Sequence, residues 1–585
     1  MIINVVSLFI CLSLVNYEIP FDMYVGQYPL LIIYSVISAV SLFLILIRNK
    51  IVWGNWLDIF PCILVAYIII NGLIQNNIFL QDLFIIALCL TIWFNFRYFV
   101  VQEKAYEVVI LSLCFYVLYE CFLSGLQFFH IIPSNNSACL ATGTFYNSGP
   151  LANLLALTFP FCLWEILRPN KNKTDYRYWA IVATFIISIL IVLITLSRTA
   201  WCAMIISSAI LIYYRYKGYF KKIFADKKRR IFAVFMTVIS ICVLALNLYY
   251  IKPTSVNSRF FIWKISSKVI GDSPIWGHGL NGFEYQYIDK QEHYFRSASG
   301  IPAEQLNADI PQFAFNEFIE ILCEFGLTGF IILFVFLALC CKQLLANHYK
   351  YVGIAWCVAL LMTCLFSYPL QTPPTFMIFL VLLVLISTNR NLFNNKCFFV
   401  AGFRVVCCIL VILLSVLTVS MIMDNNHFIK YKGEKSHFGL LKNETIDDIY
   451  SSFSYPLRNN MTFIYDYAQW HEFRGRYNDA LEYYFKLDGL TANNNILYNL
   501  GLLQQKMNLY TEAEKLFYKA HFRLPGHFYP LYYLMLLYEE QDRTSDALWI
   551  AKEIINKQIK IDSKHVQKII SEAKYLIEEN NLIEF

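Results

Sequence analysis

Long apolar runs separated by short polar segments fill the first 420 residues of this chain. A helix needs about 20 apolar residues to cross the hydrocarbon core of a bilayer. The pattern predicts about twelve or thirteen membrane helices on this criterion, near residues 1–16, 29–47, 57–74, 79–96, 107–129, 149–167, 178–196, 200–214, 231–250, 315–341, 352–368, 374–389 and 405–423. One long polar stretch, residues 251–314, interrupts the series and is the first place to look for chemistry.

The composition agrees with this pattern. Hydrophobic residues make up 58% of the 585 and charged residues only 15%, whereas soluble domains carry about a quarter charged residues. The sequence therefore predicts an all-α, polytopic membrane protein. Its first apolar stretch lacks a basic flank and a small-residue cleavage site, so we expect a retained helix and not a signal peptide.

Basic residues divide the polar segments into two sets. Segments rich in Lys and Arg include Arg48, Arg97, Arg168 and the run from Arg215 to Arg230, while the alternate segments have almost none. The positive-inside rule then predicts a protein of the inner membrane with a cytoplasmic N-terminus. The 251–314 loop and, for an odd number of spans, the C-terminal domain are expected in the periplasm. Because the net charge of +6 follows this segregation, we expect membrane lipids and no nucleic acid as partners.

A different pattern starts at residue 424. Helical segments beginning at Tyr477, Tyr510 and Thr544 recur at intervals of 33 and 34 residues, and each carries Ala three residues later. This helix–turn–helix period resembles the tetratricopeptide repeat, an α-solenoid that binds partners. A non-repetitive helical domain is the alternative. We thus expect four parts: N-terminal membrane helices (1–250), a periplasmic loop with an amphipathic helix (251–314), further membrane helices (315–423) and a helical repeat domain (424–585).

Two arginines are candidates for binding an anion. Arg198 lies in the turn between two apolar runs, where a charge at the edge of hydrocarbon must snorkel or meet an anion. Arg259 lies in a predicted interfacial helix, Asn257–Ile270, capped by Asn257 or Ser258 and ended by Gly271 and Pro274. A guanidinium in the first turn, next to the helix amides, would form an anion site. A solvated arginine is the alternative reading for this residue.

Acidic residues mark the start of the next apolar run. Glu317, Glu320 and Glu324 share one helical face after Asn316. Carboxylates that enter a membrane are costly unless they line a cavity or pair with arginine, although a solvated first turn would also suit Glu317 and Glu320. The 17 cysteines lie mostly in apolar runs without a CxxC pair, so the sequence predicts no metal site, no disulfide framework and no cofactor.

These segments together resemble a known family. SRTAW (from Ser197), SRFFIWKISSKVIGDSPIWGHGLNGF (from Ser258) and FNEFIEILCEFGLTG (from Phe315) are similar to the signature of the O-antigen ligase and polymerase superfamily, and TGTFYNSGPLANLLALTFPF (Thr142–Phe161) resembles its upstream segment. The resemblance covers about residues 100–390 in the order that the family has. It implies a metal-independent inverting glycosyltransferase, which takes a glycan from an undecaprenyl-diphosphate carrier and joins it to an acceptor hydroxyl in the periplasm.

The resemblance also implies roles for particular residues. Arg198 and Arg259 match the arginines that bind the diphosphate. Many members have a histidine just before the Asn of the third segment, but here Phe313 and Phe315 cannot accept a proton. The candidates for the general base are therefore Glu317, His278 and His293. Asn316, Glu320 and Glu324 are expected to be supporting residues of the site.

The acceptor is open as well. It could be a lipid A core sugar, another lipid-linked repeat unit, or an exported protein held by the repeat domain. Two other classes, a polysaccharide transporter and a non-catalytic membrane scaffold, remain as alternatives. Charges at the predicted outer face, and not at the bilayer midplane, argue against a transporter.

Overall fold

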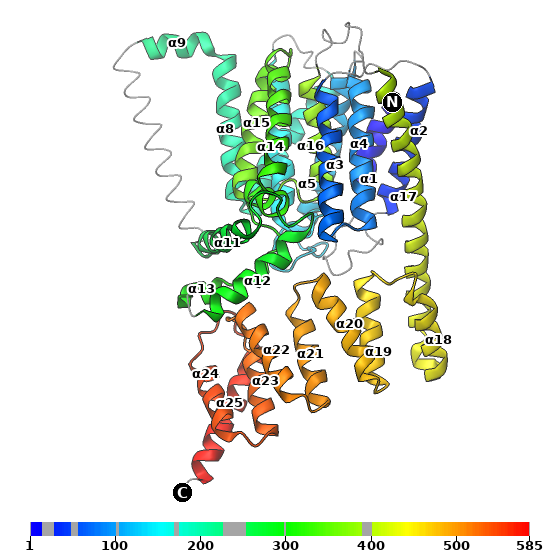
Figure 1. The fold of residues 1–585 in the computed structure, drawn as a ribbon. Coiled ribbons are helices and arrows are strands. Elements are labelled where there is room, and N and C mark those ends of the chain that lie inside the picture. The colour runs from blue at the N-terminus through cyan, green and yellow to red at the C-terminus, as the bar shows by residue number, and fades with distance from the viewer. Residues whose placement is uncertain are drawn as a thin grey trace. The chain divides into compact units, whose positions relative to one another are not determined.

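The computed structural model describes residues 2–13, 29–47, 56–100, 104–168, 175–225, 253–297, 300–388 and 400–583. Helices are the regular structure throughout these ranges, as predicted for an all-α chain (Figure 1). The chain forms two compact units, which we describe separately. The first comprises residues 1–251, 274–280 and 315–429, and the second comprises residues 252–273, 281–314 and 430–585.

The first unit is a helical bundle. Its helices are α1 (Ile2–Ser13), α2 (Pro29–Ile47), α3 (Trp56–Gln75), α4 (Leu80–Val100), α5 (Ala105–Phe128), α6 (Ser148–Leu167), α7 (Tyr176–Thr195), α8 (Arg198–Arg215), α9 (Lys217–Ala225), α14 (Glu317–Leu345), α15 (Lys350–Phe366), α16 (Pro373–Ser387) and most of α17 (Val400–Lys435). Every predicted span coincides with one of them, except 231–250, which lies outside the described residues.

Burial separates the inner from the outer helices of this bundle. Most residues of α6 and nearly all of α16 are buried, as expected for helices that are apolar on all sides. α4 packs against α16, and α8 packs against α6. In contrast, α2, α3, α7 and α17 expose large apolar side chains such as Ile33, Ile70, Leu190 and Ile412. An apolar outer surface of this kind suits lipid.

Seven described helices are long and apolar enough to cross a membrane: α3, α4, α5, α6, α7, α14 and α17. Four more apolar helices are shorter, and they include α1 with 12 residues; residues 1 and 14–16 of the predicted span 1–16 lie outside the described residues. The chain is a multi-pass membrane protein, and the count of twelve or thirteen spans stays a prediction.

The second unit combines the polar stretch after residue 251 with the C-terminal helices. It contains α11 (Pro253–Asp272), α12 (Gly282–Arg296), α13 (Pro302–Asn307), the 3₁₀ turn Phe438–Leu440, α18 (Asn443–Ser454), α19 (Met461–Phe473), α20 (Tyr477–Leu490), α21 (Asn494–Lys506), α22 (Tyr510–Arg523), α23 (Tyr529–Glu540), α24 (Thr544–Asn556) and α25 (Lys564–Ile583). The stretch expected to be mainly loop is thus largely helical. α12 was missed, although Phe283, Tyr287, Ile288, Tyr294 and Phe295 give it a buried helical face.

The C-terminal helices pack as successive pairs, α19 with α20, α21 with α22 and α23 with α24. The three alanines of the predicted period, Ala480, Ala513 and Ala547, are fully buried. Gly501 lies so close to Phe517 that an added Cβ would stand 2.4 Å from its ring. Small residues therefore occupy the helix crossings, while the tetratricopeptide assignment stays a prediction. α17 continues without a break through residue 424, where the composition changes.

Candidate functional site

The link between α15 and α16, residues 367–372, joins several predicted motifs at one end of the first unit. From α6, Asn153 Nδ2 donates to Ser367 Oγ at 3.0 Å. From the first turn of α8, Thr199 Oγ1 donates to the carbonyl of Phe366 at 3.4 Å. The segment Thr142–Phe161 therefore contacts this link, and the helix that starts at Arg198 contacts the residue just before it.

The start of α14 reaches the same link. Glu317 Oε1 accepts a hydrogen bond from the amide of Leu370 at 2.6 Å, and its Oε2 accepts one from Gln371 Nε2 at 3.0 Å. The ring of Phe315 packs edge-on against Tyr368, with centroids 5.2 Å apart. Glu317 is only 2% exposed. Its carboxylate thus fixes the link and is itself held by two donors.

All three predicted carboxylates of α14 are buried. Glu320 is 2% and Glu324 8% exposed, so the reading of Glu317 and Glu320 as a solvated first turn is wrong. The reason is that α14 starts inside the unit, against the 367–372 link, and not at a water-facing surface. Asn316 caps the helix, because its Oδ1 accepts from the amides of residues 318 and 319 at 3.0 and 3.2 Å.

Arg198 is the first residue of α8. α7 ends at Thr195, Leu196 takes a left-handed conformation (φ 52°), and α8 starts two residues later. Helix dipoles are positive at the N-terminus, where a cation is unfavourable and an anion is stabilised. A guanidinium at this point therefore adds to a positive potential that suits a diphosphate.

Arg259 lies in a different setting from the one predicted. α11 already runs from Pro253, so Asn257 and Ser258 do not cap it, and Arg259 lies beyond the first turn. Ser258 Oγ instead donates to Asn307 Oδ1 of α13 at 3.1 Å. Pro253 favours an earlier start, since proline fits the first turn of a helix. Because Arg259 lies beyond the first turn, an anion bound to it cannot be held by the N-terminal amides of α11.

Two glycines, Gly277 and Gly326, allow the turn after α11 to pack closely against an interruption of α14. We call this contact the glycine lock. Gly326 interrupts α14 with φ 60° and ψ −166°. An added Cβ on Gly326 would stand 2.4 Å from the carbonyl oxygen of Ile275, and one on Gly277 would stand 2.3 Å from that of Glu324. Four main-chain hydrogen bonds of 2.7–3.1 Å join the two segments, from amide to carbonyl: His278 to Cys323, Gly279 to Glu324, Leu327 to Pro274, and Thr328 to Ile275.

Side chains of α3 and of the segment that follows it contact the same turn and the break in α14. Asn71 Nδ2 donates to the carbonyl of Trp276 and Asn77 Nδ2 to that of His278, both at 2.7 Å, and Tyr67 Oη donates to Phe325 at 2.7 Å. The glycines of the second and third motifs therefore serve backbone packing. The backbone of His278 is fixed on both sides.

His293, the other predicted histidine, lies on α12 in the second unit. Its side chain is 65% exposed and its Nε2 is 3.8 Å from Asp289 Oδ2. The structure thus places Glu317 against the 367–372 link and the start of α8 against the end of α15, just before that link. It places the backbone of His278 in the glycine lock, and His293 and Arg259 in the other unit.

The TGTF segment has partners that the sequence reading missed. Glu120 of α5 accepts from the amide of Thr144 at 2.9 Å and from its hydroxyl at 2.7 Å. Gln127 Oε1 accepts from the amides of Thr142 and Gly143 at 2.8 Å. Polar residues inside an apolar span were the available signal, because burial without a partner is costly.

A buried ion pair lies at the other end of α3. Arg97 Nε is 2.9 Å from Asp58 Oδ1, both side chains are fully buried, and Arg97 Nη1 donates to Thr388 Oγ1 at 2.8 Å. Trp93 Nε1 also donates to Asp58 at 3.1 Å. The assignment of Arg97 to a basic loop was therefore wrong, since it lies inside α4 and neutralises a carboxylate of α3.

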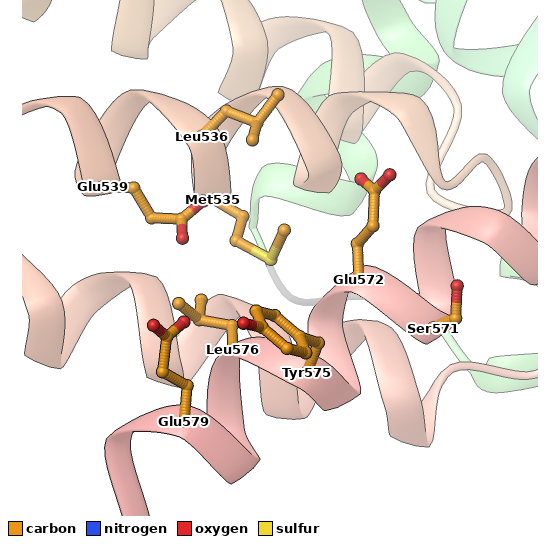
Figure 2. A pocket seen from close by; sticks show the side chains of 8 residues that line it. All are labelled: Met535, Leu536, Glu539, Ser571, Glu572, Tyr575, Leu576 and Glu579. Carbon is orange, nitrogen blue, oxygen red and sulfur yellow. The ribbon is translucent and has the colours of Figure 1, made fainter. Parts of the chain in front are cut away.

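A cavity of about 360 Å³ lies between α23 and α25 of the second unit (Figure 2). Met535, Leu536 and Leu576 supply apolar walls. The remaining lining residues are Ser571, Tyr575 and three glutamates, Glu539, Glu572 and Glu579. None of the predicted site residues lies in it, so it is separate from the link described above.

Residues 183–334 match a family model described as O-antigen ligase. They include Arg198, Arg259, the glycine lock and the start of α14. A search of curated proteins found no match. The family match supports a membrane enzyme of the O-antigen ligase or polymerase type, whose substrates are a lipid-linked glycan and a glycan acceptor.

Proposed function

We propose, on the premise that this chain carries an O-antigen ligase domain at residues 183–334, that it transfers a glycan from undecaprenyl diphosphate to an acceptor hydroxyl. The observation that carries the proposal is the 367–372 link, which holds the buried carboxylate of Glu317 and directly follows Phe366, the residue that the start of α8 contacts. An anion site and a base are the two groups that inverting transfer requires.

The reaction breaks the bond between the anomeric carbon and the diphosphate oxygen. The acceptor oxygen forms the new bond at the anomeric carbon, its proton passes to the base, and the diphosphate leaves with the bonding electron pair. Arg198, at the positive end of α8, stabilises the charge that develops on the leaving group. The family resemblance assigns Arg259 to the diphosphate as well.

Glu317 is the base that the geometry favours. Two donors, Leu370 N and Gln371 Nε2, stabilise its ionised form, and each oxygen keeps a further lone pair for a proton. His278 and His293 remain the alternatives. His293 is the weaker of the two, because a largely exposed imidazole is not held in a fixed orientation.

The acceptor is a sugar hydroxyl, as in a ligase, or a Ser or Thr hydroxyl of an exported protein. The paired C-terminal helices and the cavity between α23 and α25 support a protein acceptor or partner, since three glutamates around apolar walls would favour basic segments. A polymerase of repeat units is the alternative within the family. The large loop and the C-terminal domain are proposed to face the periplasm.

The test is glycan transfer in a strain that lacks this protein, complemented with wild type, Arg198→Ala, Arg259→Ala or Glu317→Gln. Arg177→Ala, an exposed arginine at the start of α7, is the matched control. We expect the three site variants to lose transfer by roughly a hundredfold at equal protein level, as removal of one transition-state donor does. Lipopolysaccharide ladders and periplasmic glycoproteins from the same cells identify the acceptor.

Full transfer by all three variants would refute the hypothesis that this protein is the enzyme and would favour the hypothesis that it is a non-catalytic membrane scaffold. A transporter is tested separately, by movement of a labelled lipid-linked sugar across proteoliposomes. Movement that survives Arg198→Ala and Glu317→Gln, together with no transfer by wild type, would favour that class.

A further inference from the structure

A buried polar cluster joins the helices after residue 251 to the C-terminal helices, within the second unit. We define this latch as Gln291 and Glu292 of α12, Asp488 of α20 and Arg523 of α22. We propose that the latch positions Arg259 for the lipid-linked donor, so that the C-terminal domain contributes to transfer as a support of the donor site. The inference rests on the proposed function, since it takes Arg259 as a donor-binding residue.

Arg523 is the centre of the latch. It is 1% exposed, its Nη1 donates to Asp488 Oδ1 at 3.2 Å, and its Nε is 3.9 Å from Glu292 Oε2. A charge at this depth is stable only with its partners in place, and removing one partner is strongly destabilising. The arginine therefore holds α12 and α20 to α22 at one point.

Gln291 adds a neutral connection beside the charges. Its side chain is fully buried, and its Nε2 donates to the carbonyl of Arg523 at 2.6 Å and to that of Asp309 at 3.2 Å. One amide group thus fixes the end of α22 and the segment after α13. A leucine has nearly the same volume but offers no donor, so it would leave these carbonyls unpaired.

α12 passes this constraint to the helix that carries Arg259. Lys264 of α11 donates to Tyr294 Oη of α12 and to Glu304 Oε1 of α13, both at 2.7 Å, and Tyr294 donates to Glu304 Oε2 at 2.7 Å. The ring of Phe261 lies 5.7 Å from that of Phe295. Phe261 and Lys264 lie within about two turns of Arg259 on the same helix.

The chain offers a matched control on α22. Lys519 lies 3.3 Å from the other oxygen of Asp488, and no contact of its side chain with α12 is among those the structure gives for the described residues. Lys519→Ala therefore removes an ion pair with Asp488 and leaves the latch in place. Arg523→Lys keeps the charge but loses the forked geometry, so an intermediate effect is expected.

The experiment uses the purified full-length protein in nanodiscs and has two readouts. Hydrogen exchange followed by mass spectrometry reports on the peptides of α11 and α12. Initial rates over a range of undecaprenyl-diphosphate-linked glycan give kcat and KM for the donor. For Arg523→Ala and Gln291→Leu we expect about tenfold faster exchange in α11 and α12. We also expect KM to rise by at least severalfold while kcat changes less.

The outcomes are distinct. Faster exchange with unchanged kcat and KM would overturn the positioning role, and so would a lower kcat with unchanged KM, which indicates only a loss of folded protein. A response to Lys519→Ala as large as that to Arg523→Ala would also overturn it. If wild type shows no transfer, the proposed function fails and the positioning role with it. The exchange readout then shows whether the latch still joins α12 to α22.

Discussion

Replacing Gly326 by alanine tests the glycine lock between α14 and the turn after α11. The combination of φ 60° and ψ −166° is essentially restricted to glycine, and another residue there costs ~1–3 kcal/mol. The added Cβ would also lie 2.4 Å from the carbonyl oxygen of Ile275, which is backbone and cannot rotate away. Separating the two segments weakens four main-chain hydrogen bonds, each worth ~0.5–1.5 kcal/mol.

The expected loss is about 3 kcal/mol or more, since the backbone strain and at least two of these bonds are affected. At ~2–4 °C per kcal/mol a loss of about 3 kcal/mol lowers the melting temperature by roughly 6–12 °C. Thermal unfolding in detergent, followed by fluorescence-detected size exclusion, measures it. The control is Gly125→Ala in α5, where an added Cβ meets nothing within 4 Å. Equal melting of the two variants would refute the reasoning.

Two further predictions concern charges. Arg97→Met alone leaves the buried carboxylate of Asp58 without its cationic partner and should lower the free energy of unfolding by ~3–5 kcal/mol. Arg97→Met combined with Asp58→Leu should recover most of this loss. Equal melting temperatures of the single and double variants would contradict the prediction. Burial alone would raise the pKa of Glu304, but hydrogen bonds from Lys264 and Tyr294 lower it overall. A carboxylate with a lowered pKa stabilises the fold above its unfolded value, ~4.3. That stability is lost as the pH falls through the folded value. Glu304→Gln should therefore speed hydrogen exchange in α13 at pH 7 and have little effect near pH 3, and an equal effect at both pH values would contradict it.

The helical bundle could be predicted because its signal is local. Each apolar run contains its own evidence for a membrane helix, and the runs coincide with helices wherever the structure describes them. α12 was harder to predict because Tyr287 and Gln291 mix aromatic and polar groups on its buried face. Its partner, α22, lies more than 200 residues later in the chain. Only that partner explains why a glutamine belongs in a helical core.

The candidate site also combines residues that local motifs predict with contacts that depend on distant segments. Motif order and residue type nominate Arg198, Arg259 and Glu317, and their roles stay predictions. The donors to Glu317 come from Leu370 and Gln371, whose contacts depend on how α15 and α16 close. The start of α11 was placed too late because Asn257 and Ser258 are common cap residues, and Pro253 further upstream was overlooked.

The latch has a consequence for experiments that remove domains. A chain cut before residue 430 would lack Asp488 and Arg523, and it would leave Gln291 and Glu292 in water beside the uncovered rings of α12. Loss of transfer in such a chain would have two indistinguishable origins, a missing acceptor site or a disordered donor helix. Point substitutions on either side of the latch keep these origins separate, as does grafting of related C-terminal domains that retain an arginine at position 523.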